Sequence, residues 1–214
     1  MSIIVRAWPA YDAFRCRAFS WRAGLPVAKK VALALGLAAF TGIVAQVRVQ
    51  LPFTPVPVTG QVLGVLLSGV LCGRVYGGLS QTLYVGLGAA GLPWFAGFTG
   101  GLGVLSGVTG GYLVGFVVAA ELIGRASDRY VAARRFAPQL CLMALGAMLI
   151  LICGAAWLSV VLQTGFRQAV LLGVVPFLPG DALKVLIAAS LSTALLPKAS
   201  YDGEADAAAH RRKP

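Results

Sequence analysis

The stretch VTGQVLGVLLSGVLCGRVYGGLSQTLYVGLGAA, residues 58–90, decides the fold class of this 214-residue chain. It contains a single charged side chain, Arg74, which separates two apolar runs. The surroundings continue the pattern, because the region from Val31 to Gly124 adds only Arg48 and Glu121 to that one charge. A soluble domain needs far more charge to cover its surface, whereas a bilayer favours such runs. The sequence therefore predicts an integral membrane protein.

Composition supports this interpretation. Hydrophobic residues make up 58% of the chain and charged residues 12%. In soluble globular domains about half of the residues are hydrophobic and about a quarter are charged. Six apolar segments predict an all-α architecture of about six transmembrane helices, at residues 31–47, 58–72, 75–90, 105–123, 138–162 and 182–196. Several are shorter than the roughly 20 residues of a straight span, and short, interrupted segments are typical of binding sites in transport proteins.

Basic residues set the orientation and the division of the chain. With both termini in the cytoplasm, all but three of the 18 Lys and Arg residues lie on the cytoplasmic side, as the positive-inside rule requires; the exceptions are Arg48, Arg167 and Lys184. We expect a basic segment at 1–27 that is interfacial or disordered, a six-helix transmembrane domain at 28–197, and a disordered cytoplasmic tail at 198–214.

This topology places three connections outside, at residues 48–57, 91–104 and 164–180. They are apolar and rich in Pro, Gly and aromatic residues. Irregular backbone at membrane depth is tolerated only where it lines a protein cavity. We therefore expect these connections to fold back over a pocket that opens to the outside.

No catalytic or metal-binding pattern is found. The four cysteines form no CxxC pair, no GxxxxGK[ST] loop is present, and the single histidine lies in the tail. The net charge is +11, but the basic residues flank apolar runs and do not alternate with aromatic residues. This pattern argues against nucleic-acid binding. We expect neither an enzyme nor a resident cofactor or metal.

The sharpest local motif is PGDALK at residues 179–184. Asp181 opens the predicted last helix, and Lys184 lies one turn later on the same face. One interpretation is a helix cap with an ion pair between these side chains. The other is a ligand site, because ionisable groups within a span usually face a cavity. A small ligand with N–H donors and an anionic end would match this pair.

Four blocks of sequence resemble the BioY family of biotin transporter substrate-binding components. They read QLPFTPVPVTGQVLG at 50–64, GLPWFAG at 91–97, GVTGGYLVGF at 107–116, and PGDALK. The resemblance extends over residues 28–197. It implies a six-helix component of an energy-coupling-factor vitamin importer, located in the bacterial cytoplasmic (inner) membrane. Such a component works with a transmembrane coupling subunit and two ATPase subunits.

The resemblance also implies the site. Given the chemistry of biotin, we expect Asp181 to accept from its ureido N–H groups and Lys184 to meet the ureido carbonyl or the carboxylate. Further contacts come from Tyr112, Gln61, Thr59 and Phe95, and the backbone of the Gly97–Gly101 loop is left to hold the carboxylate. Trp94 stands where the family favours a smaller aliphatic residue.

Small residues on the first helix have two interpretations. Ala34 and Ala38, with Ala32 and Gly36, form small-residue faces suited either to internal packing or to docking of a membrane partner. The resemblance implies that Ala34 and Ala38 meet the coupling subunit. An alternative function is a stand-alone facilitator for biotin or another small vitamin-like solute, which would need no ATPase partner.

Overall fold

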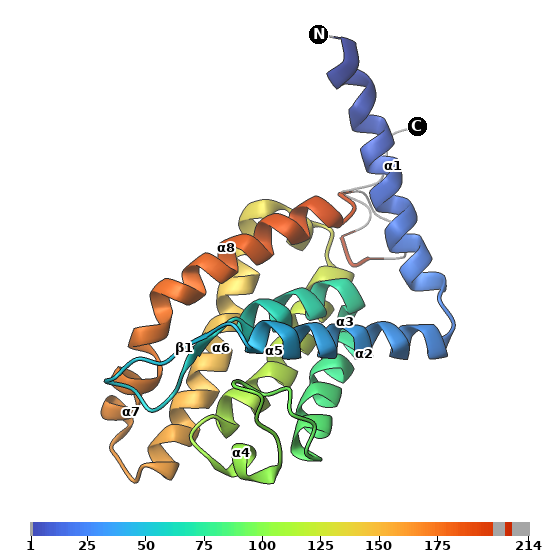
Figure 1. The fold of residues 1–214 in the computed structure, drawn as a ribbon. Helices are drawn as coiled ribbons and strands as arrows, with labels where there is room; N and C mark the ends of the chain where they lie inside the picture. The colour runs from blue at the N-terminus through green and yellow to red at the C-terminus, as the bar shows by residue number, and fades with distance from the viewer. Residues whose placement is uncertain (1, 199–203, 207–214) are drawn as a thin grey trace.

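The computed structural model describes residues 2–198 and 204–206, and these are mostly helical. Figure 1 shows the arrangement of α1 (Ser2–Gly24), α2 (Val27–Ala45), α3 (Gln61–Ala89), α4 (Leu102–Ser106), α5 (Gly110–Arg129), α6 (Phe136–Val161), α7 (Phe166–Gly173) and α8 (Leu178–Leu195). Two 3-10 turns, η1 (Ala132–Arg134) and η2 (Val175–Phe177), precede α6 and α8. Strands β1 (Arg48–Val49) and β2 (Val58–Thr59) pair antiparallel, which adds a small hairpin to the predicted all-α fold.

The exterior of the bundle is that of a membrane protein. Four stretches are long and apolar enough to cross a bilayer, namely Val27–Ala45, Gln61–Ala89, Phe136–Val161 and Phe166–Leu195. Large apolar side chains such as Ile43, Leu145 and Leu183 are exposed along α2, α6 and α8. Water-soluble proteins rarely expose contiguous surfaces of this kind, whereas lipid chains solvate them.

Helix α3 consists of two arms that fold back on each other at Gly73. Gly73 has a φ of 76°, which favours glycine, and residues 61–72 and 74–89 form the arms on either side. The arms pack side by side. Gln81 Nε2 on one arm donates to Ser68 Oγ on the other at 2.9 Å, and a Cβ on Gly77 would lie 2.8 Å from the Gly69 Cα. The second and third apolar segments of the sequence are therefore separate helical arms, as expected.

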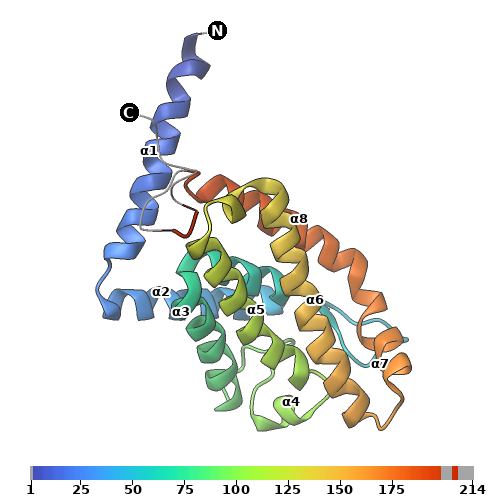
Figure 2. The same ribbon diagram turned by 180° about the vertical axis from the view of Figure 1, so that it is seen from behind.

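Helix α5 runs between α3 and α6, as Figure 2 shows, and it is longer than the sequence suggested. The end of the fourth apolar segment at residue 123 is not the end of the helix, since α5 continues to Arg129. A Cβ at Gly124 would lie 2.5 Å from the carbonyl carbon of Gly73 and 2.7 Å from Arg74 N. Gly124 is thus a point of close helix approach and not a helix terminator. The fourth segment is also interrupted, because α4 ends at Ser106 before α5 begins.

The cytoplasmic ends predicted from the sequence are more ordered than expected. The basic N-terminal segment forms α1, which projects from the bundle in Figure 1; its position at the lipid headgroups stays a prediction. Part of the tail predicted to be disordered is anchored: Glu204 pairs with the buried Arg134 at 2.9 Å, and the Asp206 carboxylate accepts from the Val131 and Ala132 N–H groups at 2.8 Å. These contacts satisfy polar groups at the α5–α6 connection. The rest of the tail after Lys198 lies outside the described residues.

Candidate functional site

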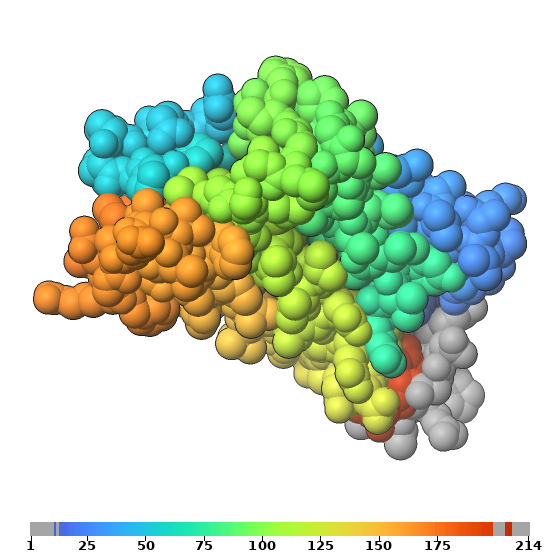
Figure 3. All heavy atoms as spheres, turned by 90° about the horizontal axis from the view of Figure 1, so that it is seen from below, coloured from blue at the N-terminus to red at the C-terminus, as the bar shows by residue number. Residues whose placement is uncertain are grey.

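A cavity of about 250 Å³ lies at the end of the bundle where the three predicted outside connections meet. The first connection contributes Gln50 and Val56, the second Ala96 and Thr99, and the third Phe177. Figure 3 shows this face, with the residues of the β-hairpin (cyan), of the 91–106 region (green) and of α7 (orange) gathered around it. All but one of the predicted ligand-binding residues line this cavity; those that do are Asp181, Lys184, Tyr112, Gln61, Thr59 and Phe95.

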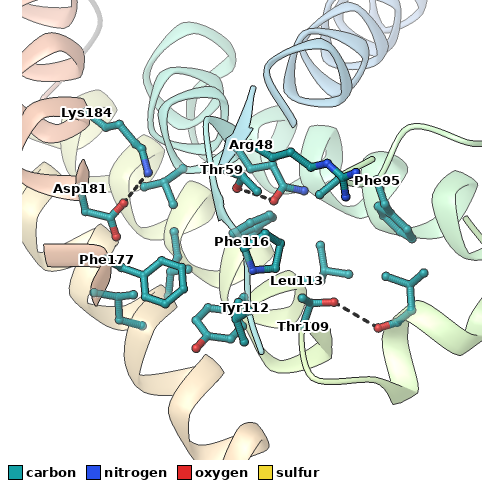
Figure 4. A pocket seen from close by; sticks show the side chains of 18 of the residues that line it. Arg48, Thr59, Phe95, Thr109, Tyr112, Leu113, Phe116, Phe177, Asp181 and Lys184 are labelled. Atoms are coloured by element: carbon teal, nitrogen blue, oxygen red, sulfur yellow. Dashed lines mark hydrogen bonds and ion pairs between the residues drawn. The ribbon is translucent and has the colours of Figure 1, made fainter. Parts of the chain in front are cut away.

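Asp181 and Lys184 form an ion pair at one side of the cavity (Figure 4). Lys184 Nζ donates to Asp181 Oδ1 at 2.7 Å, and their side chains are 14% and 5% exposed respectively. Helix α8 begins at Leu178, three residues before Asp181, so this carboxylate lies within the first turn and does not cap the helix. Asp181 Oδ2 is buried and has no hydrogen-bond partner among the described residues. Because an unpaired buried acceptor costs free energy, this oxygen is available to a ligand donor.

Tyr112 forms a wall of the cavity and does not offer its hydroxyl proton to it. The Tyr112 hydroxyl donates to the Gly173 carbonyl at 2.7 Å, and its ring packs against Phe177 with centroids 6.1 Å apart. A Cβ at Gly154 would collide with this ring, so α6 must carry glycine there for the ring to fit. The expected polar contact of Tyr112 with a ligand is therefore replaced by an aromatic surface.

Thr59 and Gln61 begin a chain of hydrogen bonds that leads away from the cavity. Thr59 Oγ1 donates to Gln61 Oε1 at 2.7 Å, and Gln61 Nε2 donates to the Tyr84 hydroxyl at 2.6 Å. The Tyr84 hydroxyl in turn donates to the Trp94 carbonyl at 3.3 Å. Trp94 itself lies behind Tyr84, with its Nε1 bonded to the Tyr84 carbonyl at 2.8 Å, and does not line the cavity.

The loop after α3 is fixed by Gln46, a residue that the motif analysis missed. Gln46 Oε1 accepts from Phe98 N at 3.0 Å, while its Nε2 donates to the carbonyls of Trp94 and Phe95 at 3.3 and 3.1 Å. Phe95 is 1% exposed and contacts the ring of Tyr84 edge-on at 5.4 Å. The loop thereby holds Phe95 as an apolar wall of the cavity.

Arg48 supplies the cation that the sequence analysis did not find. Its guanidinium lines the cavity away from the Asp181–Lys184 pair (Figure 4) and has no acidic partner among the described residues. Gly97, the predicted residue that does not line the cavity, lies against this guanidinium, and a Cβ there would collide with it. One signal was available, because Arg48 is the only basic residue between Lys30 and Arg74 and it begins a connection expected to line the pocket.

The two alanines expected to meet a partner face the interior. Ala34 and Ala38 are 0% exposed, so the packing interpretation holds for them and their side chains cannot form a docking surface. The opposite side of α2 exposes Ala28, Ala32 and Gly36, which repeat every four residues. A periodicity of about 3.6 residues places this second set of small residues on a different face from Ala34 and Ala38.

Comparisons with known proteins agree on one family. The model of the BioY family matches residues 16–200. A probable biotin transporter BioY of Methanothermobacter thermautotrophicus is 48% identical over 147 residues, which cover 65% of this chain and 94% of that protein. The biotin transporter BioY of Thermotoga maritima is 39% identical over 72% of this chain and 88% of that protein. A crystal structure of the S-component for biotin from an ECF-type ABC transporter matches with a TM-score of 0.73 at 26% identity, covering 78% of this chain and 90% of that chain.

Proposed function

The chain belongs to the BioY family, and from this premise we propose that the cavity beneath the β1–β2 hairpin is its biotin-binding site. The protein is a biotin transporter of the substrate-binding type and not an enzyme. The observation that carries the site assignment is the buried Asp181 Oδ2, which has no hydrogen-bond partner among the described residues and lies at the cavity.

Biotin has three chemically distinct parts, and the cavity offers a matching surface to each. The ureido ring has two N–H donors, for which the free oxygen of Asp181 is a charged acceptor. The ureido carbonyl suits Lys184, whose ammonium is already held in place by Asp181 Oδ1. The apolar thiophane ring fits between aromatic walls formed by Tyr112, Phe116 and Phe177. A cavity of about 250 Å³ suits a compact ligand of this kind.

Arg48 is the group that we assign to the valerate carboxylate. It replaces the expected role of the Gly97–Gly101 backbone, because it provides a full charge and a fork of N–H donors at the cavity. Gly97 contributes indirectly, since only the absence of a side chain lets the guanidinium lie there. Arg48 and the Asp181–Lys184 pair thus bind opposite ends of the vitamin.

Six crossings with both termini in the cytoplasm remain our proposal for the topology. The support is the return of α3 at Gly73, which gives two arms in addition to α2, α5, α6 and α8. In this orientation the cavity faces outward, and the Arg-rich ends of α1 and α5 face inward, in agreement with the positive-inside rule. The protein then lies as a multi-pass component in the cytoplasmic membrane.

The partners that fit this function are a transmembrane coupling subunit and two ATPase subunits, with lipid around the bundle. We assign the coupling subunit to the exposed face of α2 that carries Ala28, Ala32 and Gly36, because small residues at this spacing allow close helix approach in lipid. At Gly36, a Cβ would meet no other element of the described residues within 4 Å, so the face is open for a partner.

The proposed function is tested by equilibrium binding of labelled biotin to the purified, detergent-solubilised chain. The parent and a Glu121→Gln control, which neutralises an exposed acid on α5, are expected to bind saturably. Asp181→Asn is expected to bind much more weakly. A folded parent that does not bind biotin would refute the assignment. Uptake into vesicles that contain this chain alone, without ATP, would instead favour the stand-alone facilitator.

A further inference from the structure

A second cavity, of about 350 Å³, lies at the other end of the bundle, between α1, α2 and the Gly73 turn of α3. Arg22, Lys30 and Arg74 line it together with Tyr76 and Asp128. In the orientation proposed above, this end faces the cytoplasm. Neither the biotin site nor the proposed surface for the coupling subunit includes these side chains.

The carboxylates at this cavity are already engaged. Asp128 Oδ1 accepts from Arg22 at 2.6 Å, and its Oδ2 accepts from Arg74 N at 2.9 Å. Glu204, which also borders the cavity, pairs with Arg134 at 2.9 Å. These contacts fix the walls, and they leave the positive charges of Lys30 and Arg74 uncompensated.

Lys30 and Arg74 are the two cations without an acidic partner among the described residues at this cavity. The Lys30 ammonium lies 5.8 Å from the centre of the Tyr76 ring, and the Arg74 side chain is exposed. Two such cations that line one cavity with Tyr76 suit an anion with several acceptor oxygens, such as a phosphate diester.

An apolar groove of about 240 Å³ adjoins the basic cavity and shares Phe19, Arg22 and Leu33 with it. The groove runs between α1, α2, α3 and the end of α8, and it is lined by Phe14, Trp21, Leu37, Leu71, Leu195 and Leu196. Phe14 and Trp21 are 60% and 62% exposed. A free inorganic anion would leave this apolar surface exposed to water, whereas an acyl chain would bury it.

From this combination we infer that the two cavities form one binding site for an anionic phospholipid, with the headgroup phosphate between Lys30 and Arg74 and an acyl chain in the adjoining groove. Basic pockets between helices on the cytoplasmic side of membrane proteins bind anionic headgroups by the same chemistry. Because α1 forms one wall of both cavities, the bound lipid fixes α1 against the bundle.

Native mass spectrometry of the full, delipidated chain tests this inference. Phosphatidylglycerol and phosphatidylcholine with identical acyl chains are titrated against the parent, against Lys30→Gln/Arg74→Gln, and against Lys29→Gln/Arg125→Gln. The last variant removes the same charge from exposed residues that do not line either cavity. We expect the parent and this control to prefer phosphatidylglycerol by roughly 30-fold, the sum of two basic contacts, and the first variant to lose the preference.

Two further probes separate the possible occupants. Ala18→Trp fills the groove without changing any charge and is expected to weaken phosphatidylglycerol binding, while biotin binding stays at the parent level in every variant. Inorganic phosphate that binds as tightly as the lipid would overturn the acyl-chain half of the site. Equal binding of both lipids would overturn the inference. So would the absence of lipid binding, if the coupling subunit instead protects Lys30 from a chemical acylating reagent.

Discussion

Replacing Arg48 by glutamine tests how the cavity recognises the ligand carboxylate. The substitution removes the positive charge and keeps a shorter, polar side chain. The guanidinium also lies against Gly97, so the assay must separate loss of the charge from a shift of this loop. The change therefore tests the interaction of one cation with one end of biotin.

The expected loss follows from the position of Arg48. At about 4 Å and an effective dielectric constant of about 20, two opposite charges attract by about 4 kcal/mol. Arg48 is an exposed residue whose guanidinium only borders the cavity, and solvent screening lowers exposed pairs to about 1 kcal/mol or less. Between these limits we expect a loss of about 1–2 kcal/mol, which corresponds to a roughly 5- to 30-fold rise in Kd.

The assay compares biotin with its carboxamide, in which the charged end is neutral. Isothermal titration gives Kd for both ligands with the parent, with Arg48→Gln and with Arg167→Gln, which removes another exposed arginine that does not line the cavity. The parent and the control should prefer biotin by this factor, and Arg48→Gln should bind both ligands with the affinity of the parent for the carboxamide.

A preference for biotin that survives in Arg48→Gln would refute the carboxylate assignment. So would an equal loss of affinity for both ligands, because that result would mean that Arg48 only supports the loop packed on it. The four-way comparison is needed because a single Kd cannot distinguish a lost contact from a displaced loop.

Three further substitutions are predicted from the structure. Asp181→Asn replaces the free acceptor by an amide donor, and the loss of one charged hydrogen bond, about 1.5–3 kcal/mol, should raise the Kd for biotin roughly 10- to 150-fold in the same titration. Gly154→Val forces a side chain into the Tyr112 ring and should cost about 1–3 kcal/mol, seen as a lower midpoint of thermal unfolding in detergent. Gly73→Ala should lower the same midpoint, since φ is positive there and a Cβ meets the Asp128 carboxylate; the strain is about 1–3 kcal/mol.

Matched controls make these predictions specific. Gly86→Ala adds a methyl group in the second arm of α3, where no atom lies within 4 Å, and the unfolding midpoint should stay unchanged or rise slightly. A fall as large as that of the other two glycine variants would mean that close contact is not the cause. Glu121→Gln is the matched control for Asp181→Asn, because it neutralises an exposed acid that does not line the cavity.

Hydrophobic patterning allowed the helical segments to be predicted, but it did not determine where they end. Gly124 in sequence is indistinguishable from a helix terminator, and only the approach of Gly73 from another helix explains its place inside α5. The orientation of α2 was ambiguous for a similar reason, since small residues occupy two of its faces and only packing decides which is buried.

For the site, PGDALK was decisive because ionisable residues are rare in an apolar chain. Its Asp181–Lys184 pair lines the cavity as expected. Arg48 escaped notice because a charge count treats every arginine outside the spans alike. Its position in the cavity depends on the pairing of β1 with β2. The sequence between these strands has no periodic pattern from which the pairing could be predicted.

The return of α3 at Gly73 has a consequence for the synthesis of the protein. Each arm is shorter than the roughly 20 residues that cross a bilayer unaided, and Ser68 and Gln81 bond to each other across the two arms. An arm that entered the hydrocarbon alone would carry these polar groups without partners, at a cost in free energy. In the proposed six-crossing topology, we therefore expect both arms to enter the bilayer together, as a helical hairpin, once residue 89 has been synthesised.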